Sequence, residues 1–258
     1  METHSYVATI NLNYMGTRYS PLRINLNTGG MMITGNLNQL QLNGGGMISY
    51  GQDNHGNDTV ISGYRIWMQP AGMDERIKIG DDLHIADIGY YYIRPKIYLQ
   101  AFGNYSTSQL HQIDERYMAG FSVGYTPIRE KQKLFRASIG GFWEYTSYPF
   151  ETFNIEVDHE ENIRTLPRIG FISNGWYRVP NNQNLSFRYL AWFYIDPLNI
   201  ADYRYRANAE VNFNLTKTVS LRLSTTYEYS SVVMEGLSVY DLRSNAGLGF
   251  SFPPKKKK

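Results

Sequence analysis

Two stretches of the chain hold residue types that do chemistry, and each is centred on a histidine. His111 lies in TSQLHQID (107–114), with Ser106 and Ser108 before it and Asp114 after it. A serine hydrolase needs a histidine placed against a serine hydroxyl, and a carboxylate or amide that orients the imidazole. No catalytic sequence motif surrounds these residues. A polar loop is the ordinary interpretation, and we predict no catalytic residue.

The second stretch is VDHEEN (157–162), where Asp158, Glu160 and Glu161 flank His159. Hard divalent cations bind clustered carboxylates, which makes these three acids a weak candidate metal site. Three acids within four loop residues are more often simply solvated. The glycine groups 29–30 and 44–46 have no following Lys-Ser/Thr pair and no helix, so bends or bulges explain them better than a phosphate loop. We therefore predict no cofactor.

Composition limits the class of protein. The 258 residues include 22 Tyr, 12 Phe and 4 Trp but no Cys, and the net charge is +2. No disulfide framework or thiolate site is available. The 25 basic residues are spread along the chain apart from the terminal KKKK (255–258), which argues against a nucleic-acid partner. No apolar run approaches the roughly 20 residues that a membrane-spanning helix needs.

Apolar residues recur at every second position over most of the sequence. From Asp202 to Tyr229, Tyr and aliphatic residues alternate with Arg, Asn and Glu on both sides of a turn at Thr216 and Lys217. Period two is typical of a strand, because successive side chains of an extended chain point to opposite faces. No segment has a convincing helical period. The whole chain, residues 1–258, is therefore predicted to be one all-β domain, with residues 253–258 as a flexible tail.

Thirteen segments are predicted to be extended: 5–15, 22–34, 38–50, 58–69, 82–93, 95–106, 114–126, 133–147, 163–178, 184–195, 202–215, 218–230 and 239–252. Most prolines fall between them, but Pro167 falls inside one. A closed antiparallel bacterial barrel with both termini on one side needs an even number of strands. We therefore expect about twelve strands, with fourteen as the alternative. The segment that is wrongly assigned is expected in the region from Pro21 to Gly46.

The connections divide into two classes by length. Short ones occur at 93–95, 126–132, 179–184 and 216–217, and longer ones at 69–81, 107–114, 149–163, 196–202 and 231–238. Short turns at one rim and long loops at the other are the pattern of outer-membrane barrels, whose short turns face the periplasm. The fold class we predict is a closed antiparallel transmembrane β-barrel.

The two faces of such a barrel have different predicted neighbours. Aromatic residues near strand ends, with Ala, Val and Leu between them, indicate an outer face in lipid. We assign to this aromatic girdle Tyr203, Tyr205, Phe213, Tyr227, Tyr229, Tyr125, Tyr145, Phe250 and Phe252. The other face would line a lumen with charges of both signs. We assign to it Arg204, Arg206, Glu210, Arg222, Glu228, Asp241, Arg243, Arg188, Arg136, Glu144 and Arg116.

Three stretches resemble a family of bacterial outer-membrane β-barrels of unknown function, labelled salt-induced outer-membrane proteins: RYMAGFSVGYTPIREKQKLFRASIGGFWEYTSY, DPLNIADYRYRANAEVNFNLTKTVSLRLSTTYEYSS and YDLRSNAGLGFSF. The shared features are a glycine-rich strand before a short turn, the DYRYR start and the NLTKTVSL hairpin. The resemblance covers the second half of the chain. It implies a Gram-negative outer membrane and no established activity. Two departures are the PPKKKK that follows Phe252 and the stretch up to Pro21, which is extra.

Three functional hypotheses remain open. The first is a monomeric outer-membrane barrel, either a narrow channel for small solutes or ions or a structural envelope protein, with lipid as its partner. The second is an outer-membrane hydrolase of the lipase or protease type. The third is a soluble ligand-binding barrel whose apolar face points inward. The opening METHSYVATI lacks a signal peptide, so either the protein stays inside the cell or this is a mature chain with an added Met1; we predict the mature outer-membrane form.

Overall fold

The computed structural model describes residues 4–15, 22–34, 38–52, 54–69, 75–109, 111–130, 132–149, 153, 162–180, 182, 184–216, 219–233 and 235–252. The described residues form strands and connections. The strands are β1 (His4–Met15), β2 (Leu22–Thr34), β3 (Asn38–Gly51), β4 (His55–Gln69), β5 (Ile77–Arg94), β6 (Ile97–Ser108), β7 (Ile113–Arg129), β8 (Lys133–Ser147), β9 (Ile163–Arg178), β10 (Leu185–Ile195), β11 (Tyr203–Asn214), β12 (Val219–Ser230) and β13 (Tyr240–Phe252). No helix in this described part is long and apolar enough to cross a membrane.

All thirteen predicted segments are strands, and the expectation of about twelve, with fourteen as the alternative, was wrong. Every strand pairs antiparallel with its neighbours in sequence. The error came from assuming that every pair must be antiparallel. An up-and-down run of thirteen strands leaves the first and last strands parallel, and β1 does pair with β13 in parallel. This seam joins only Ile10–Tyr14 to Leu248–Phe252.

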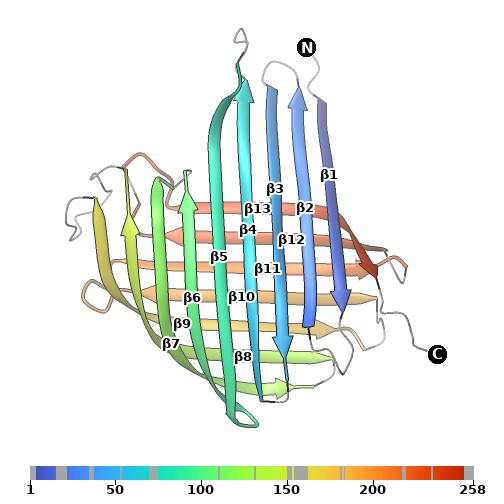
Figure 1. Cartoon of the computed structure of the whole chain (residues 1–258), viewed down its shortest axis with the longest axis vertical. Helices are drawn as coiled ribbons and strands as arrows, with labels where there is room; N and C mark the ends of the chain where they lie inside the picture. The colour runs from blue at the N-terminus through green and yellow to red at the C-terminus, as the bar shows by residue number, and fades with distance from the viewer. Residues whose placement is uncertain are drawn as a thin grey trace.

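The sheet wraps around an interior. Figure 1 shows β1 to β5 side by side along the near wall, with β10 to β13 crossing behind them at a steep angle. The antiparallel order places the connections after β5, β7, β9 and β11 at one rim, here called the short-turn rim. Those after β4, β6, β8, β10 and β12 lie at the opposite rim, here called the long-loop rim. The predicted division of the connections between two rims is confirmed.

Pro167 shows why a proline is tolerated inside β9. It lies opposite Trp143 of β8, whereas the ladder between β9 and β10 ends at the pair Ile169 and Ile195. Beyond that pair, β9 has an unpaired side. A residue without an N–H group is accepted at such an edge position.

Exposure alternates along the strands with the period of two. On β7, Phe121 and Val123 are 77% and 54% exposed, whereas Met118 and Ser122, which point to the other face, are buried. On β8, Ile139 and Trp143 are exposed, whereas Glu144 is 2% exposed. The apolar series therefore points outward, and the series that points to the interior holds the polar residues together with some apolar ones such as Met118. This is the reverse of what a soluble barrel with an apolar interior requires.

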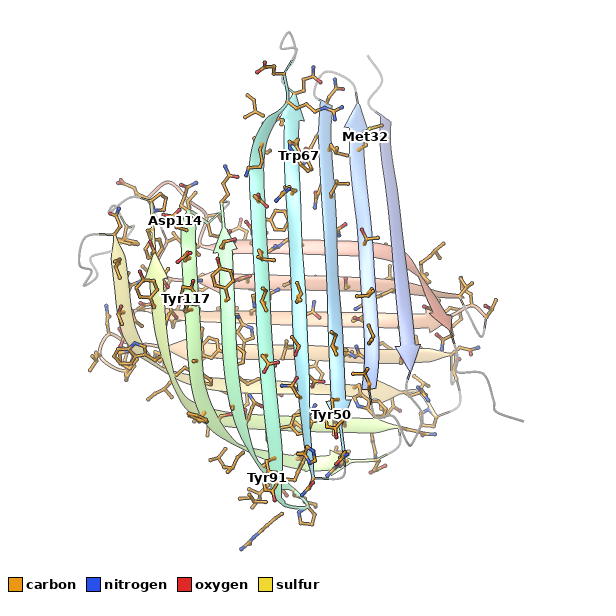
Figure 2. The ribbon with its side chains drawn as sticks, in the orientation of Figure 1. Met32, Tyr50, Trp67, Tyr91, Asp114 and Tyr117 are labelled. Atoms are coloured by element: carbon orange, nitrogen blue, oxygen red, sulfur yellow. The ribbon has the colours of Figure 1, made fainter. Side chains whose placement is uncertain are left out.

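Aromatic residues of the outward face collect toward both rims. Near the long-loop rim Tyr203, Tyr205 and Tyr229 stack, with ring centroids 5.6 and 5.0 Å apart for the pairs that involve Tyr229. Tyr105, Tyr117 and Tyr145 continue this band across β6, β7 and β8. In Figure 2, Tyr50 and Tyr91 mark the opposite end of the near wall from Trp67. Aliphatic side chains, together with Phe121 and Phe171, occupy the middle of the strands.

Apolar side chains fill part of the interior between β6 and β10. Met118, Phe142, Ile172 and Tyr194 are buried, and Phe102, Leu190 and Trp192 pack against them. The rings of Phe142 and Tyr194 meet edge to face, with centroids 5.2 Å apart. Gly170 makes this packing possible, because a Cβ there would lie 2.5 Å from both rings.

We predict that Gly170→Ala lowers the free energy of unfolding by about 1–3 kcal/mol, the usual cost of overpacking a core. The matched control is Gly141→Ala on β8, where an added Cβ meets nothing within 4 Å. The measurement is the urea midpoint of protein folded in detergent. Equal midpoints for the two variants would contradict the packing described.

Candidate functional site

A cluster of buried ion pairs crosses the interior near the long-loop rim. At its centre, the Glu144 carboxylate on β8 accepts hydrogen bonds from Arg204 of β11 and from Arg168 of β9, the latter at 3.2 Å. Arg116 of β7 lies 3.7 Å from the same carboxylate. Thr146 donates its hydroxyl to Glu144 at 3.1 Å. One acid therefore joins four strands, and we call this group with Arg164 and Asp202 the arginine cluster.

Asp202 connects the loop between β10 and β11 to this cluster. Its carboxylate accepts hydrogen bonds from Arg164 at 2.5 Å and from Arg168 at 3.1 Å. Arg168 also donates to the Asp202 carbonyl at 2.9 Å. Burial alone would raise the pKa of Asp202, but the Arg168 and Arg164 guanidinium groups outweigh it and hold that pKa below its ordinary value of 3.8.

The charges of the arginine cluster do not balance. Four guanidinium groups, those of Arg116, Arg164, Arg168 and Arg204, share the two carboxylates of Glu144 and Asp202. Arg204 and Arg168 are 4% and 2% exposed, so water offers them little compensation. The Nε atoms of Arg164 and Arg204 are buried without a hydrogen-bond partner. The cluster carries an excess of positive charge.

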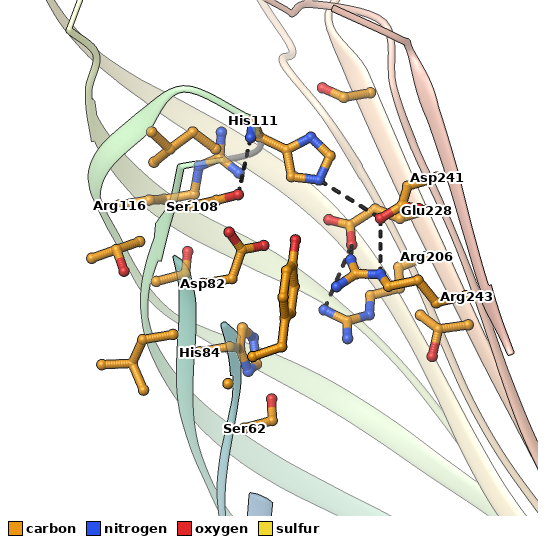
Figure 3. Close-up of a pocket in the computed structure, with 18 of the residues that line it drawn as sticks. Ser62, Asp82, His84, Ser108, His111, Arg116, Arg206, Glu228, Asp241 and Arg243 are labelled. Carbon is orange, nitrogen blue, oxygen red and sulfur yellow. Dashed lines mark hydrogen bonds and ion pairs between the residues drawn. The ribbon is translucent and has the colours of Figure 1, made fainter. Parts of the chain in front are cut away.

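A cavity of about 490 Å³ adjoins the arginine cluster, and we call it the chamber. Figure 3 shows its two walls. One wall carries Ser62, Asp82, His84, Ser108 and Arg116, and the other carries Arg206, Glu228, Asp241 and Arg243. Residues of the connections at the long-loop rim, including Val232 and Val233, also line the chamber. The volume falls within the roughly 300–1,000 Å³ of small-molecule sites.

The wall formed by β11 to β13 is a balanced ladder of ion pairs. Arg206 lies 3.8 Å from Glu228, and Arg243 lies 3.5 Å from Glu228 and 2.8 Å from Asp241. The Arg243 guanidinium also faces the ring of Tyr64 at 5.3 Å, which joins β13 to β4 across the interior. Charges on this wall are matched by one another.

The opposite wall holds polar groups with fewer partners. Asp82 makes no ion pair with any described residue, and its Oδ1 is buried without a hydrogen bond. The Tyr64 hydroxyl and the His111 Nε2 are also buried without a hydrogen bond. His84 lies deeper, with its Nε2 2.7 Å from Asn104. Among the described residues, no group of three His, Asp or Glu has the geometry to hold a metal ion.

The predicted lumen residues form three groups of ion pairs, and two arginines lie outside these groups. Arg204, Glu144 and Arg116 belong to the arginine cluster, and Arg206, Glu228, Asp241 and Arg243 form the ladder of the chamber. Glu210 and Arg222 pair with each other. Arg136 donates to Asn174 at 3.1 Å and lies over Tyr90, whereas Arg188 is exposed.

The structure places most of the predicted girdle residues on the outward face. Phe213 and Tyr125 are exposed, and Tyr203, Tyr205, Tyr227, Tyr229 and Tyr145 are half-buried within the aromatic contacts of the outward face. The side chains of Phe250 and Phe252, and the candidate metal residues Asp158, Glu160 and Glu161, lie outside the described residues.

The candidate hydrolase residues do not form a nucleophile and base pair among the described residues. Ser108 Oγ accepts a hydrogen bond from the backbone N–H of His111 at 3.1 Å. The His111 imidazole faces Asp241 instead, with Nε2 3.9 Å from the carboxylate. Asp114 is exposed at the rim. A triad would need an imidazole nitrogen within hydrogen-bond reach of the serine hydroxyl.

Sequence reasoning missed Arg164, Arg168, Tyr64 and Asp82 as interior residues. On β9 the interior series also contains Leu166 and Ile172, so the contrast between the two faces is weak there. On β4 and β5 polar and apolar residues share both faces. The sequence offered one indication for these residues. Side chains alternate between the two faces of a strand, so each residue could have been assigned a face by counting from a residue whose face was already assigned.

The family model described as "Protein of unknown function, DUF481" matches residues 26–252. The chain belongs to this family. The match begins within β2 and ends with β13, so β1 lies outside it. None of the curated proteins matches the sequence.

Two solved structures align with this chain. The NanC porin is 12% identical with a TM-score of 0.48, and the alignment covers 84% of this chain and 94% of that one. A Pseudomonas aeruginosa FadL homologue is 10% identical with a TM-score of 0.35, covering 95% of this chain and 75% of that one.

We predict that Asp202→Asn destabilises the protein by about 3–5 kcal/mol, because it leaves Arg164 and Arg168 buried with one acid fewer. Since the pKa of Asp202 is lowered by folding, its contribution is present above pH 3.8 and is lost as the pH falls below that value. The measurement is the urea midpoint as a function of pH.

The control for this prediction is Asp81→Asn, which removes a half-buried partner of Arg65 and Lys78. That change should cost about 0–1 kcal/mol. If Asp202→Asn is no more harmful than Asp81→Asn, the arginine cluster does not depend on Asp202.

Proposed function

We propose that the protein is a monomeric barrel of the bacterial outer membrane that admits small polar solutes to its interior through a narrow passage. The observation that carries the proposal is the distribution of polarity. Ion pairs with side chains only a few per cent exposed lie inside the sheet, whereas Phe121, Ile139 and Trp143 are exposed outside it. Lipid is the solvent that matches such an outer face.

The aromatic bands support this placement. Tyr side chains collect near both rims of the outward face, where an apolar body and a polar hydroxyl suit the boundary between lipid and water. The long-loop rim would then face the cell exterior and the short-turn rim the periplasm. The chamber would receive solutes from outside the cell.

The interior favours a narrow passage over a wide pore. The apolar core around Phe142 and Tyr194 and the arginine cluster fill the side bounded by β6 to β11. The chamber lies on the other side, between β4 and β5 and β11 to β13. Its charged walls would exclude apolar solutes, because such solutes cannot replace the hydration of charged groups.

We expect small, discrete conductance steps from detergent-folded protein in a planar lipid bilayer. Replacing Arg206 and Arg243 together by Gln leaves Glu228 and Asp241 unbalanced, so the reversal potential in a salt gradient should shift toward cation preference. Arg65→Gln is the control, since Arg65 is exposed on the outward face and should leave selectivity unchanged. Silence from protein shown to be folded and inserted would contradict the channel and favour a structural envelope role.

A further inference from the structure

The excess positive charge of the arginine cluster opens onto the chamber. Arg116 and Arg204 belong to the cluster, and both line the chamber. Arg116 uses its Nε for Thr146 at 3.1 Å, and no described residue accepts a hydrogen bond from its two terminal nitrogens. The Arg204 Nε is buried and unpaired. Two guanidinium groups that lack a full set of acceptors therefore meet at one side of a cavity.

The acids around the chamber are too few to cancel this excess. Glu228 and Asp241 are engaged by Arg206 and Arg243 on the opposite wall. Asp82 is the remaining acid of the chamber, and it makes no ion pair with Arg116 or Arg204. Counting the arginine cluster, the ladder and Asp82 together, six guanidinium groups face five carboxylates. A buried charge without a partner is costly, so an anion bound here would be stabilised.

We propose that the chamber binds a small carboxylated solute that also carries hydroxyl groups. Its carboxylate would lie against Arg116 and Arg204, because the planar guanidinium donates paired hydrogen bonds to a carboxylate. This inference rests on the proposed function only for how the solute arrives.

The other polar atoms around the chamber favour a solute that carries hydroxyl groups. The Tyr64 hydroxyl, His111 Nε2 and Asp82 Oδ1 are buried and without hydrogen-bond partners among the described residues. The set contains acceptors and groups that can donate. A hydroxyl group both donates and accepts, so a polyhydroxylated acid satisfies this mixture, whereas a simple inorganic anion satisfies only the arginines.

The test is isothermal titration calorimetry of detergent-folded protein with glucuronate, and with glucose as the uncharged analogue. We expect glucuronate to bind and glucose to bind at least tenfold more weakly. Arg116→Gln should weaken glucuronate binding by about tenfold or more, the size of a lost charged hydrogen bond. Asp82→Asn should tighten it, because the change removes a negative charge from the chamber.

Arg222→Gln is the matched control, since Arg222 is an interior arginine that pairs with Glu210 and does not line the chamber. It should leave glucuronate binding unchanged. The opposite effects expected of Arg116→Gln and Asp82→Asn separate charge recognition from loss of fold. Urea midpoints of the variants are measured in parallel, and Arg204 is left intact because it is almost fully buried.

The inference is overturned if folded wild-type protein does not bind glucuronate, if glucose binds equally well, or if Asp82→Asn weakens binding. Because binding is measured in detergent, it is independent of conductance. Binding without conductance would support the site and refute the channel. Conductance without binding would leave the channel standing and refute the site.

Discussion

The burial of charge inside a sheet with an apolar outer face is the constraint on which the rest of the structure depends. Glu144 holds guanidinium groups from β7, β9 and β11, and Asp202 attaches the loop before β11 to the same group. Each of these charges would be costly in lipid. The interior is the one place where they can pair, and their pairing fixes which face of each strand points inward.

That constraint also explains the glycines and the chamber. Where large rings of Phe142 and Tyr194 share the interior, the neighbouring strand carries Gly170, which leaves them room. Where the ladder of β11 to β13 faces β4 and β5, charged and polar side chains line a cavity. The interior is therefore divided into an apolar part, an ionic part and a chamber.

Much of the fold was predictable because period two is a local signal. Each strand from β1 to β13 matches a predicted segment, and even β9 with Pro167 was placed correctly. The strand count was misjudged because pairing between β1 and β13 is a long-range property with no signal in either strand. The family match runs from within β2 to the end of β13, so β1 lies outside it.

The candidate site was predictable only in part. Arg204, Arg206, Glu228 and Arg243 stand out because their strands alternate cleanly between polar and apolar residues. Arg168 does not, because the interior series of β9 mixes it with Leu166 and Ile172. The excess of arginine over acid depends on which residues of β7, β8, β9 and β11 meet. That is set by the register between strands, which the pattern within one strand does not show.

The orientation of the two faces is tested most directly by labelling adjacent positions. The chain has no native cysteine, so Ile61→Cys and Ser62→Cys can each carry a single fluorophore in the middle of β4. Ile61 is 46% exposed on the outward face, and Ser62 lines the chamber. In vesicles, brominated lipid should quench the label at position 61, and aqueous iodide the label at position 62. The reverse pattern, or quenching of both labels by iodide alone, would contradict the account.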